Sequence, residues 1–295
     1  MKKTISHWML ALTVASSMSA FFVARAFSIN LELAVFAVTA VTLIAAMAIE
    51  RWMPFDPHWN SGNGDFKTDT TSTVVLLGVV DPLLKAFAPL LVVFAYSNIA
   101  TPETFTLFPV DASVLVQLVV ATLLIELGRY WAHRWHHTNR FLWWLHAMHH
   151  SSERLYAVNN FRFHPLNYVV NFALSTFPLM LIGVPADVLF GYMALTQPVL
   201  MLQHANIDLR SGWLNYVFST NELHRWHHSS DTTEANSNYG SALVVWDQVF
   251  GTFRLPRAIQ TPKRIGLFAQ SANYPARASY LQQILSAFGP TCCRA

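Results

Sequence analysis

Histidine is the residue whose spacing in this sequence is best suited to chemistry. The chain has 13 histidines, and 11 of them lie between positions 133 and 228. Eight form one HxxxH pair and two HxxHH boxes: His133 and His137; His146, His149 and His150; and His224, His227 and His228. Side chains three and four positions apart share one face of a helix, so each box presents two or three imidazoles to one point. This spacing predicts a metal site.

The number of histidines indicates what kind of metal site this is. Imidazole binds iron, copper and zinc alike, so the ligand type does not name the metal. A structural zinc ion takes four ligands, about half of what the boxes supply. Eight histidines are better matched to a pair of metal ions that keep coordination positions open for oxygen.

Three of the eleven clustered histidines stand outside this set of eight. His164 in the sequence RFHP and His204 after the last apolar stretch are predicted as further ligands. The alternative is that they orient a ligand through a hydrogen bond. His136 points about 100° away from the preceding and following positions of a helix, so we predict that it does not bind metal.

One carboxylate is placed to support the boxes. Glu126 lies two helical turns before His133 and three residues before Arg129. It is expected either to pair with Arg129 or to accept a hydrogen bond from the N–H of a metal-binding histidine.

The composition is that of a membrane protein. Hydrophobic residues make up 53% of the chain and charged residues only 12%, against roughly 25% charged in a soluble domain. So few charges cannot cover a water-exposed surface, and we expect the bilayer to cover much of it. The basic residues form no stripe interleaved with aromatic residues, which excludes a nucleic-acid ligand.

Apolar stretches define the expected spans. Residues 8–27 and 31–49 predict an uncleaved helical hairpin in preference to a signal peptide. Residues 72–96, interrupted by Asp81-Pro82, predict either one kinked span or two half-helices. Residues 114–131 form a further span. The last pair, 168–181 and 186–202, is a hairpin of uncertain depth, because its first member is shorter than the ~20 residues that cross a bilayer.

Charge asymmetry predicts the orientation. Arg25 is expected outside, and Lys85 and Arg129 lie within spans, so 16 of the 19 basic residues fall on the cytoplasmic side together with the boxes. The predicted fold is an all-α, integral-membrane helical bundle with a cytoplasmic histidine-rich di-metal cap. We divide it into N-terminal spans (1–125), a catalytic domain (126–254) and a polar, loosely held C-terminal tail (255–295).

The motifs HRWHH, LHAMHHSSE, RFHP and LHRWHHS, with the later NYGSALVVWDQVFGTF, resemble the fatty acid hydroxylase / sterol desaturase superfamily. The resemblance runs from about residue 126 to residue 254. It implies two iron ions, O₂, a lipid substrate, and electrons from a ferredoxin or a b-type cytochrome with its reductase. It also implies that the eight box histidines are ligands, with His164 and His204 added. One departure is Leu200, four residues before His204, where some members have a histidine.

The functional hypothesis is a bacterial inner-membrane di-iron oxygenase that hydroxylates a lipid. Desaturation at the same site is the alternative, although only eight residues separate His137 from His146, which favours the hydroxylase group. A membrane metal carrier would place its ligands inside the spans. A zinc hydrolase is disfavoured because the chain has no HExxH motif. An acyl lipid in the form of an aminolipid or phospholipid, an alkylglycerol ether, a sterol and a hopanoid all remain candidate substrates.

Overall fold

The computed structural model describes residues 1–62, 64–98, 107–255, 261–289 and 292. It is built from helices, and the described residues contain no β-strand beyond three isolated bridges. The α-helices are α1 (Lys2–Ala26), α2 (Leu31–Trp52), α3 (Phe66–Val75), α4 (Asp81–Asn98), α5 (Val114–Thr138), α6 (Arg140–His150), α7 (Pro165–Leu181), α8 (Ala186–Gln203), α9 (Asn221–His227), α10 (Thr232–Ala235), α11 (Val245–Val249) and α12 (Tyr280–Leu285).

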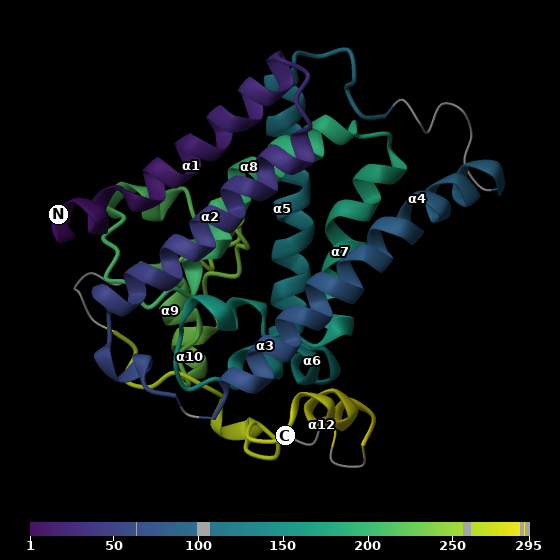
Figure 1. The fold of residues 1–295 in the computed structure, drawn as a ribbon. Helices are drawn as coiled ribbons and strands as arrows, with labels where there is room; N and C mark the ends of the chain where they lie inside the picture. Colours follow the sequence, from purple (N-terminus) through teal and green to yellow (C-terminus); the bar gives the residue numbers. More distant parts are fainter. Residues whose placement is uncertain (63, 99–106, 256–260, 290–291, 293–295) are drawn as a thin grey trace.

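Long helices form one part of the molecule, and short helices and loops gather at one end of it (Figure 1). Four helices are long and apolar enough to cross a membrane: Lys2–Ala26, Leu31–Trp52, Phe66–Asn98 and Val114–Thr138. These are the four expected spans. The predicted hairpin of uncertain depth is α7 and α8, and neither of them is among the four. The all-helical membrane fold is therefore confirmed.

The third span is one continuous helix with a π-helical turn. Between α3 and α4 the backbone widens at Leu76–Val80. Pro82 follows directly and has no N–H to donate to the preceding turn, which explains why the hydrogen-bond ladder slips there. The structure has one continuous helix here and not two half-helices; that it crosses the bilayer once stays a prediction.

Close helix contacts hold α5 against its neighbours. A Cβ atom at Gly128 would lie 2.1 Å from the carbonyl oxygen of Leu174, so only glycine lets α5 approach α7 this closely. Buried apolar side chains such as Ile125, Leu179 and Tyr192 fill the space between α5, α7 and α8. This packing fixes the direction in which α5 delivers its histidines.

Side-chain caps set where the histidine-bearing helices begin. The Asn139 side chain accepts hydrogen bonds from the N–H groups of Phe141 and Leu142 at 3.0 and 3.1 Å, so one residue ends α5 and starts α6. Thr220 caps α9 in the same way through the N–H of Leu223. The sequence thereby turns from the first box to the second without a long loop.

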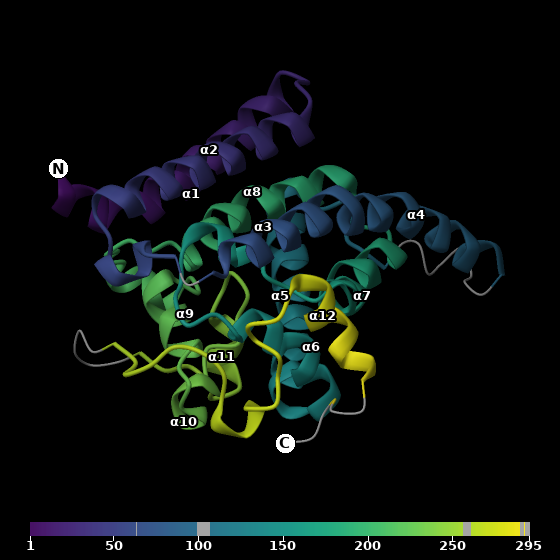
Figure 2. The ribbon, with the colours of Figure 1, turned by 60° about the horizontal axis from the view of Figure 1, so that its bottom comes forward.

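The C-terminal segment differs from the loosely held tail that the sequence predicts. Phe268 stacks on Trp143 with ring centroids 4.4 Å apart, and the indole N–H of Trp144 donates to Ser286 at 2.9 Å. Tyr274 and Tyr280 pack with α6 in a separate apolar cluster. The segment looks polar because its apolar residues are few, but those residues fit the exposed face of α6. Figure 2 shows this segment lying over α6 beside the short helices.

Candidate metal centre

The structure brings nine of the ten predicted histidines into two groups. The first contains five: His133, His137, His146, His150 and His227. The second contains four: His149, His204, His224 and His228. Within each group, one ring nitrogen from every residue lies within 4.8 Å of the others. Each HxxHH box divides its histidines between the two groups, so the groups are neighbours.

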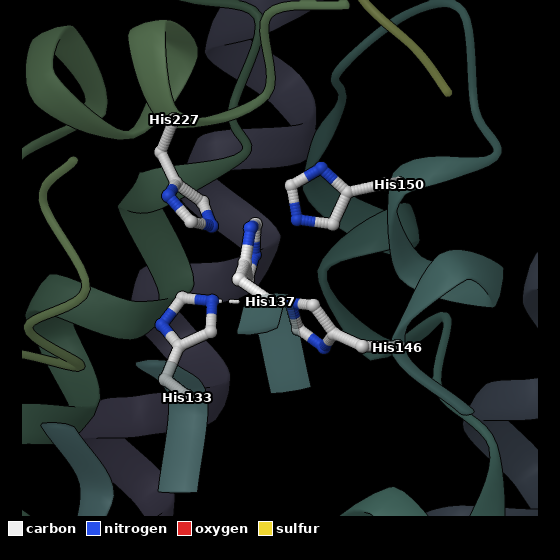
Figure 3. A group of neighbouring side chains, drawn as sticks. All are labelled: His133, His137, His146, His150 and His227. Carbon is white, nitrogen blue, oxygen red and sulfur yellow. Dashed lines mark hydrogen bonds between the residues drawn. The ribbon is translucent and has the colours of Figure 1, made fainter. Parts of the chain in front are cut away.

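Figure 3 shows the five-histidine group. The rings of His133 and His137 come from α5, those of His146 and His150 from α6, and that of His227 from α9, and they face a common point. The Nε2 atoms of His133 and His146 are 3.0 Å apart. His133 and His137 keep some accessible surface, whereas the other three are buried.

The four-histidine group is buried throughout. Nε2 of His224 lies 3.0 Å from Nε2 of His204 and 3.1 Å from Nε2 of His228. Nε2 of His228 is also 3.1 Å from Nε2 of His149. Four imidazoles therefore converge through the same kind of nitrogen from α6, α8 and α9.

These distances fit bound metal ions. Two nitrogens at ~2.1 Å from one ion, at a right angle, are about 3.0 Å apart. In the five-histidine group, the buried Nε2 atoms of His137 and His227 and both ring nitrogens of His150 lack a hydrogen-bond partner, whereas at His149, His224 and His228 the unpartnered nitrogen is Nδ1. Buried polar atoms are normally satisfied, so such a concentration indicates a group that accepts their lone pairs. The donor set is nitrogen only and exceeds what one zinc ion takes.

One short segment orients three members of the five-histidine group. Nδ1–H of His133 donates to the carbonyl oxygen of Tyr239 at 2.8 Å, and Nδ1–H of His227 donates to that of Ser237 at 2.9 Å. The side-chain oxygen of Asn236 lies 3.3 Å from Nδ1 of His137. A carbonyl can only accept, so Nδ1 carries the proton and Nε2 keeps its lone pair for a metal.

Asp247 holds this segment in place. Its carboxylate accepts the N–H groups of Tyr239 and Gly240 and the hydroxyl of Thr252, each at 2.7 Å. Asp247 is fully buried. A Cβ atom at Gly240 would lie 2.1 Å from the carbonyl oxygen of Leu243, so the chain turns here without room for a side chain.

Glu126 supports the adjoining loop and no histidine. Its carboxylate accepts the hydroxyl of Tyr192 at 2.7 Å and the N–H groups of Ala242 and Leu243 at 2.8 Å. The expected hydrogen bond to a metal-binding histidine is therefore absent, and so is an ion pair with Arg129 among the described residues. The hydroxyl of Tyr192 and the backbone N–H groups of residues 242 and 243 occupy this carboxylate instead.

Amide side chains orient two further histidines. Asn159 accepts from Nδ1–H of His204 at 2.8 Å, and Asn167 accepts from Nδ1–H of His146 at 2.9 Å. Glu50, at the end of α2, accepts the N–H groups of Ala157 and Asn206 beside the four-histidine group. The membrane hairpin is thereby attached to the site.

Two of the eleven histidines between positions 133 and 228 lie outside both groups. Nδ1 of His164 accepts the N–H of Leu166 at the start of α7, and its Nε2–H donates to the carbonyl oxygen of Ile284 at 3.3 Å. The structure therefore places His164 outside both groups, as the cap of α7. His136 is buried and donates Nδ1–H to the carbonyl oxygen of Ala132 at 2.6 Å.

Burial keeps the clustered imidazoles neutral. It lowers the pKa of His204 to about 3 and that of His227 to about 4, and the nearby His227 adds to the lowering at His204. Burial also lowers the pKa of His149, His224 and His228 well below the usual range, with further lowering from neighbouring histidines. Neutral imidazole is the form that binds metal.

Residue spacing did not reveal the residues that orient the ligands. Asn159, Asn167 and Asn236 are single amides with no motif of their own. Asp247 lies inside the quoted stretch NYGSALVVWDQVFGTF, which was the one signal available. What these residues do follows from contacts between segments far apart in the chain.

The chain matches a known family model and a known lipid hydroxylase. The family model described as fatty acid hydroxylase matches residues 118–252. The ornithine lipid hydroxylase OlsE of Rhizobium tropici is 36% identical over 235 residues, which cover 78% of this chain and 70% of that protein.

More distant matches are alkylglycerol monooxygenases. The protein of Homo sapiens is 27% identical over 187 residues, covering 63% of this chain and 41% of its own length. That of Danio rerio is 29% identical over 134 residues, covering 45% of this chain and 30% of its own length. The matches therefore span less than half of each monooxygenase. No solved structure matches the chain.

Proposed function

The chain belongs to the fatty acid hydroxylase family, and on that premise we propose that it hydroxylates a membrane lipid with O₂ at a di-iron centre held by nine histidines. The five-histidine group holds one iron ion and the four-histidine group holds the other. The observation that carries the proposal is this convergence of nine imidazoles in two adjacent groups.

The bound iron pair supplies the activation of O₂ needed to insert an oxygen atom into a C–H bond. The protein's own residues prepare the site for that chemistry. Acceptors at Tyr239, Ser237 and Asn159 hold the Nδ1 protons of His133, His227 and His204, so that Nε2 faces the metal position. This fixes ring orientation before any ligand binds, which reduces the cost of assembling the site.

Packing around the groups limits the access of water. The four-histidine group is buried, and Phe163 stacks on His149 with centroids 4.1 Å apart. On the other side, Phe268 lies 6.1 Å from His137 and 6.3 Å from His150, measured between ring centroids. Exclusion of water protects a reactive site from side reactions.

The proposed substrate is a lipid with a polar headgroup. OlsE is named for ornithine lipid and the more distant relatives for alkylglycerol, so these two lipid classes are tested first. We propose that such a lipid reaches the histidines laterally from the bilayer. Electrons come from a separate donor, a ferredoxin or a b-type cytochrome with its reductase.

We assign the site to the cytoplasmic face of a bacterial inner membrane. Helices α6 and α9, which carry histidines of both groups, lie at one end of the helical bundle (Figure 1). The predicted charge asymmetry puts that end in the cytoplasm. Cysteine labelling of single-cysteine variants at either end of α5 in intact cells tests the assignment. Labelling of the histidine-bearing end by a membrane-impermeant reagent would contradict it.

Comparative lipidomics tests the function. Membranes from cells that express the protein are expected to contain a lipid increased in mass by one oxygen atom. Cells that express His149→Ala should lack that lipid, and the purified variant should bind less iron. His58→Ala is the matched control, because His58 is outside both histidine groups. A lipid that loses two hydrogens instead would assign desaturation, and one zinc ion per chain would refute the di-iron centre.

A further inference from the structure

Arg129 is a cation in the membrane-spanning helix α5 that has no carboxylate partner. None of the ion pairs among the described residues includes it. Its Nη1–H donates to the hydroxyl of Ser241 at 3.1 Å, and its guanidinium lies 5.7 Å from the ring centroid of Tyr192. Its Nε is buried and has no hydrogen-bond partner. An unpaired charge at membrane depth is costly, and such residues usually serve a function.

The nearest acid on α5 is already engaged. Both carboxylate oxygens of Glu126 accept hydrogen bonds from Tyr192, Ala242 and Leu243. Glu126 lies near Arg129 and interacts with its charge, but the described residues contain no ion pair between the two. The Nε–H group of the guanidinium therefore remains an unused donor.

Arg129 lies on the same face of α5 as the histidines of the first box. Arg129, His133 and His137 are spaced four residues apart, and all three are partly buried. Four residues of helix rise about 6 Å, so Arg129 lies one turn from His133 toward the apolar part of the helix. Arg129 and the metal-facing histidines of the first box therefore share one face of α5.

The depth of Arg129 in the membrane determines which part of a lipid molecule would lie beside it. About 20 helical residues cross the hydrocarbon core, and counted from Val114 they end near His133. Arg129 is thus just inside the hydrocarbon, where the headgroup of a lipid joins its chains. The groups at that junction are ester or amide carbonyls and ether oxygens. An uncharged acceptor suits a site in which Glu126 already offsets the arginine.

We propose that Arg129 binds a carbonyl or ether oxygen at the junction between the headgroup and the chain of the lipid substrate. This inference rests on the proposed function and names the residue that positions the substrate. With that oxygen held one helical turn from His133, the carbon atoms next to the junction face the histidine groups. Oxidation is then directed to the polar end of the lipid and away from the chain terminus.

The test uses the iron-loaded protein in lipid nanodiscs, with ornithine lipid as the probe. Arg129→Met removes the guanidinium donors and keeps an unbranched, apolar side-chain stem. A hydrogen bond to a charged group contributes about 1.5–3 kcal/mol, so KM should rise about 10- to 100-fold. The hydroxylated position should also become heterogeneous, as read by fragmentation mass spectrometry. Arg129→Lys should fall between Arg129→Met and the wild type.

A matched control removes a different cation at membrane depth. Lys85 pairs with Asp81 at 3.0 Å and is about half exposed. Lys85→Met should leave KM, the product and the metal content unchanged. Native mass spectrometry supplies a readout independent of turnover: the wild type should retain a bound ornithine lipid that Arg129→Met loses.

The outcomes separate the two proposals. Wild-type KM, product and lipid retention in Arg129→Met would overturn the role of Arg129. Loss of metal in both Arg129→Met and Arg129→Lys would overturn it too, because the residue would then be structural. If the wild type hydroxylates no lipid but retains ornithine lipid through Arg129, the proposed function fails while the binding site stands.

Discussion

Asp247→Asn should weaken metal binding at the five-histidine group without direct contact to any metal. The carboxylate accepts three hydrogen bonds, from the N–H groups of Tyr239 and Gly240 and the hydroxyl of Thr252. An asparagine keeps one acceptor oxygen and turns an N–H₂ group toward at least one backbone N–H. At least one charge-assisted bond is lost, which costs about 1.5–3 kcal/mol.

The lost hydrogen bond of Asp247 weakens metal binding through three histidines. The segment from Asn236 to Tyr239 orients His133, His137 and His227. Removing a group that orients metal ligands typically lowers metal affinity about 10- to 100-fold. No Nδ1 atom of the four-histidine group forms a hydrogen bond with this segment. The metal affinity of that group should therefore stay unchanged.

Chelator-competition titration of the purified protein measures both sites. The wild type should bind two ions with similar affinity, and Asp247→Asn should show one site weakened by that factor. Asp231→Asn is the matched control, because Asp231 caps α10 on the surface. Equal affinities at both sites in Asp247→Asn would refute the role of the segment in orienting the ligands. So would equal weakening of both sites.

Three more predictions follow from the same contacts. The His164→Asn variant should retain both metal ions, as measured by elemental analysis, because His164 caps α7. Loss of one ion in this variant would show that His164 is a metal ligand. Glu126→Gln should lower the thermal unfolding midpoint but not the metal content, since its donors are Tyr192 and loop amides; unchanged stability would contradict this. Burial lowers the pKa of His204 to about 3 and of His227 to about 4, so the unfolded chain binds more protons below pH ~6.5. Metal-free protein should lose up to about 1.4 kcal/mol of stability per pH unit per histidine as pH falls from ~6.5 toward 4, measured by thermal unfolding; greater stability at pH 5 than at pH 7 would reverse the sign.

The spans were predictable because membrane helices follow a local rule. A stretch of apolar residues long enough to cross a bilayer must form a helix, since no water is present to satisfy the backbone. The depth of α7 and α8 was not predictable, because both are short and partly covered by other helices. The packed C-terminal segment was also missed, since a few aromatic residues fitted to α6 leave no periodic signal.

The sequence by itself determined that histidines gather in boxes, because positions three and four apart share a helix face wherever that helix lies. Only the tertiary structure decided how they divide. His149 and His150 are adjacent in the chain but belong to different groups, since neighbouring helical side chains point about 100° apart. Tertiary structure also decided that His204, at the end of α8, joins the four-histidine group and that His164 joins neither group. Which nitrogen faces the metal depends on acceptors such as Tyr239 and Asn159, and their position is set by packing between segments that no local pattern connects.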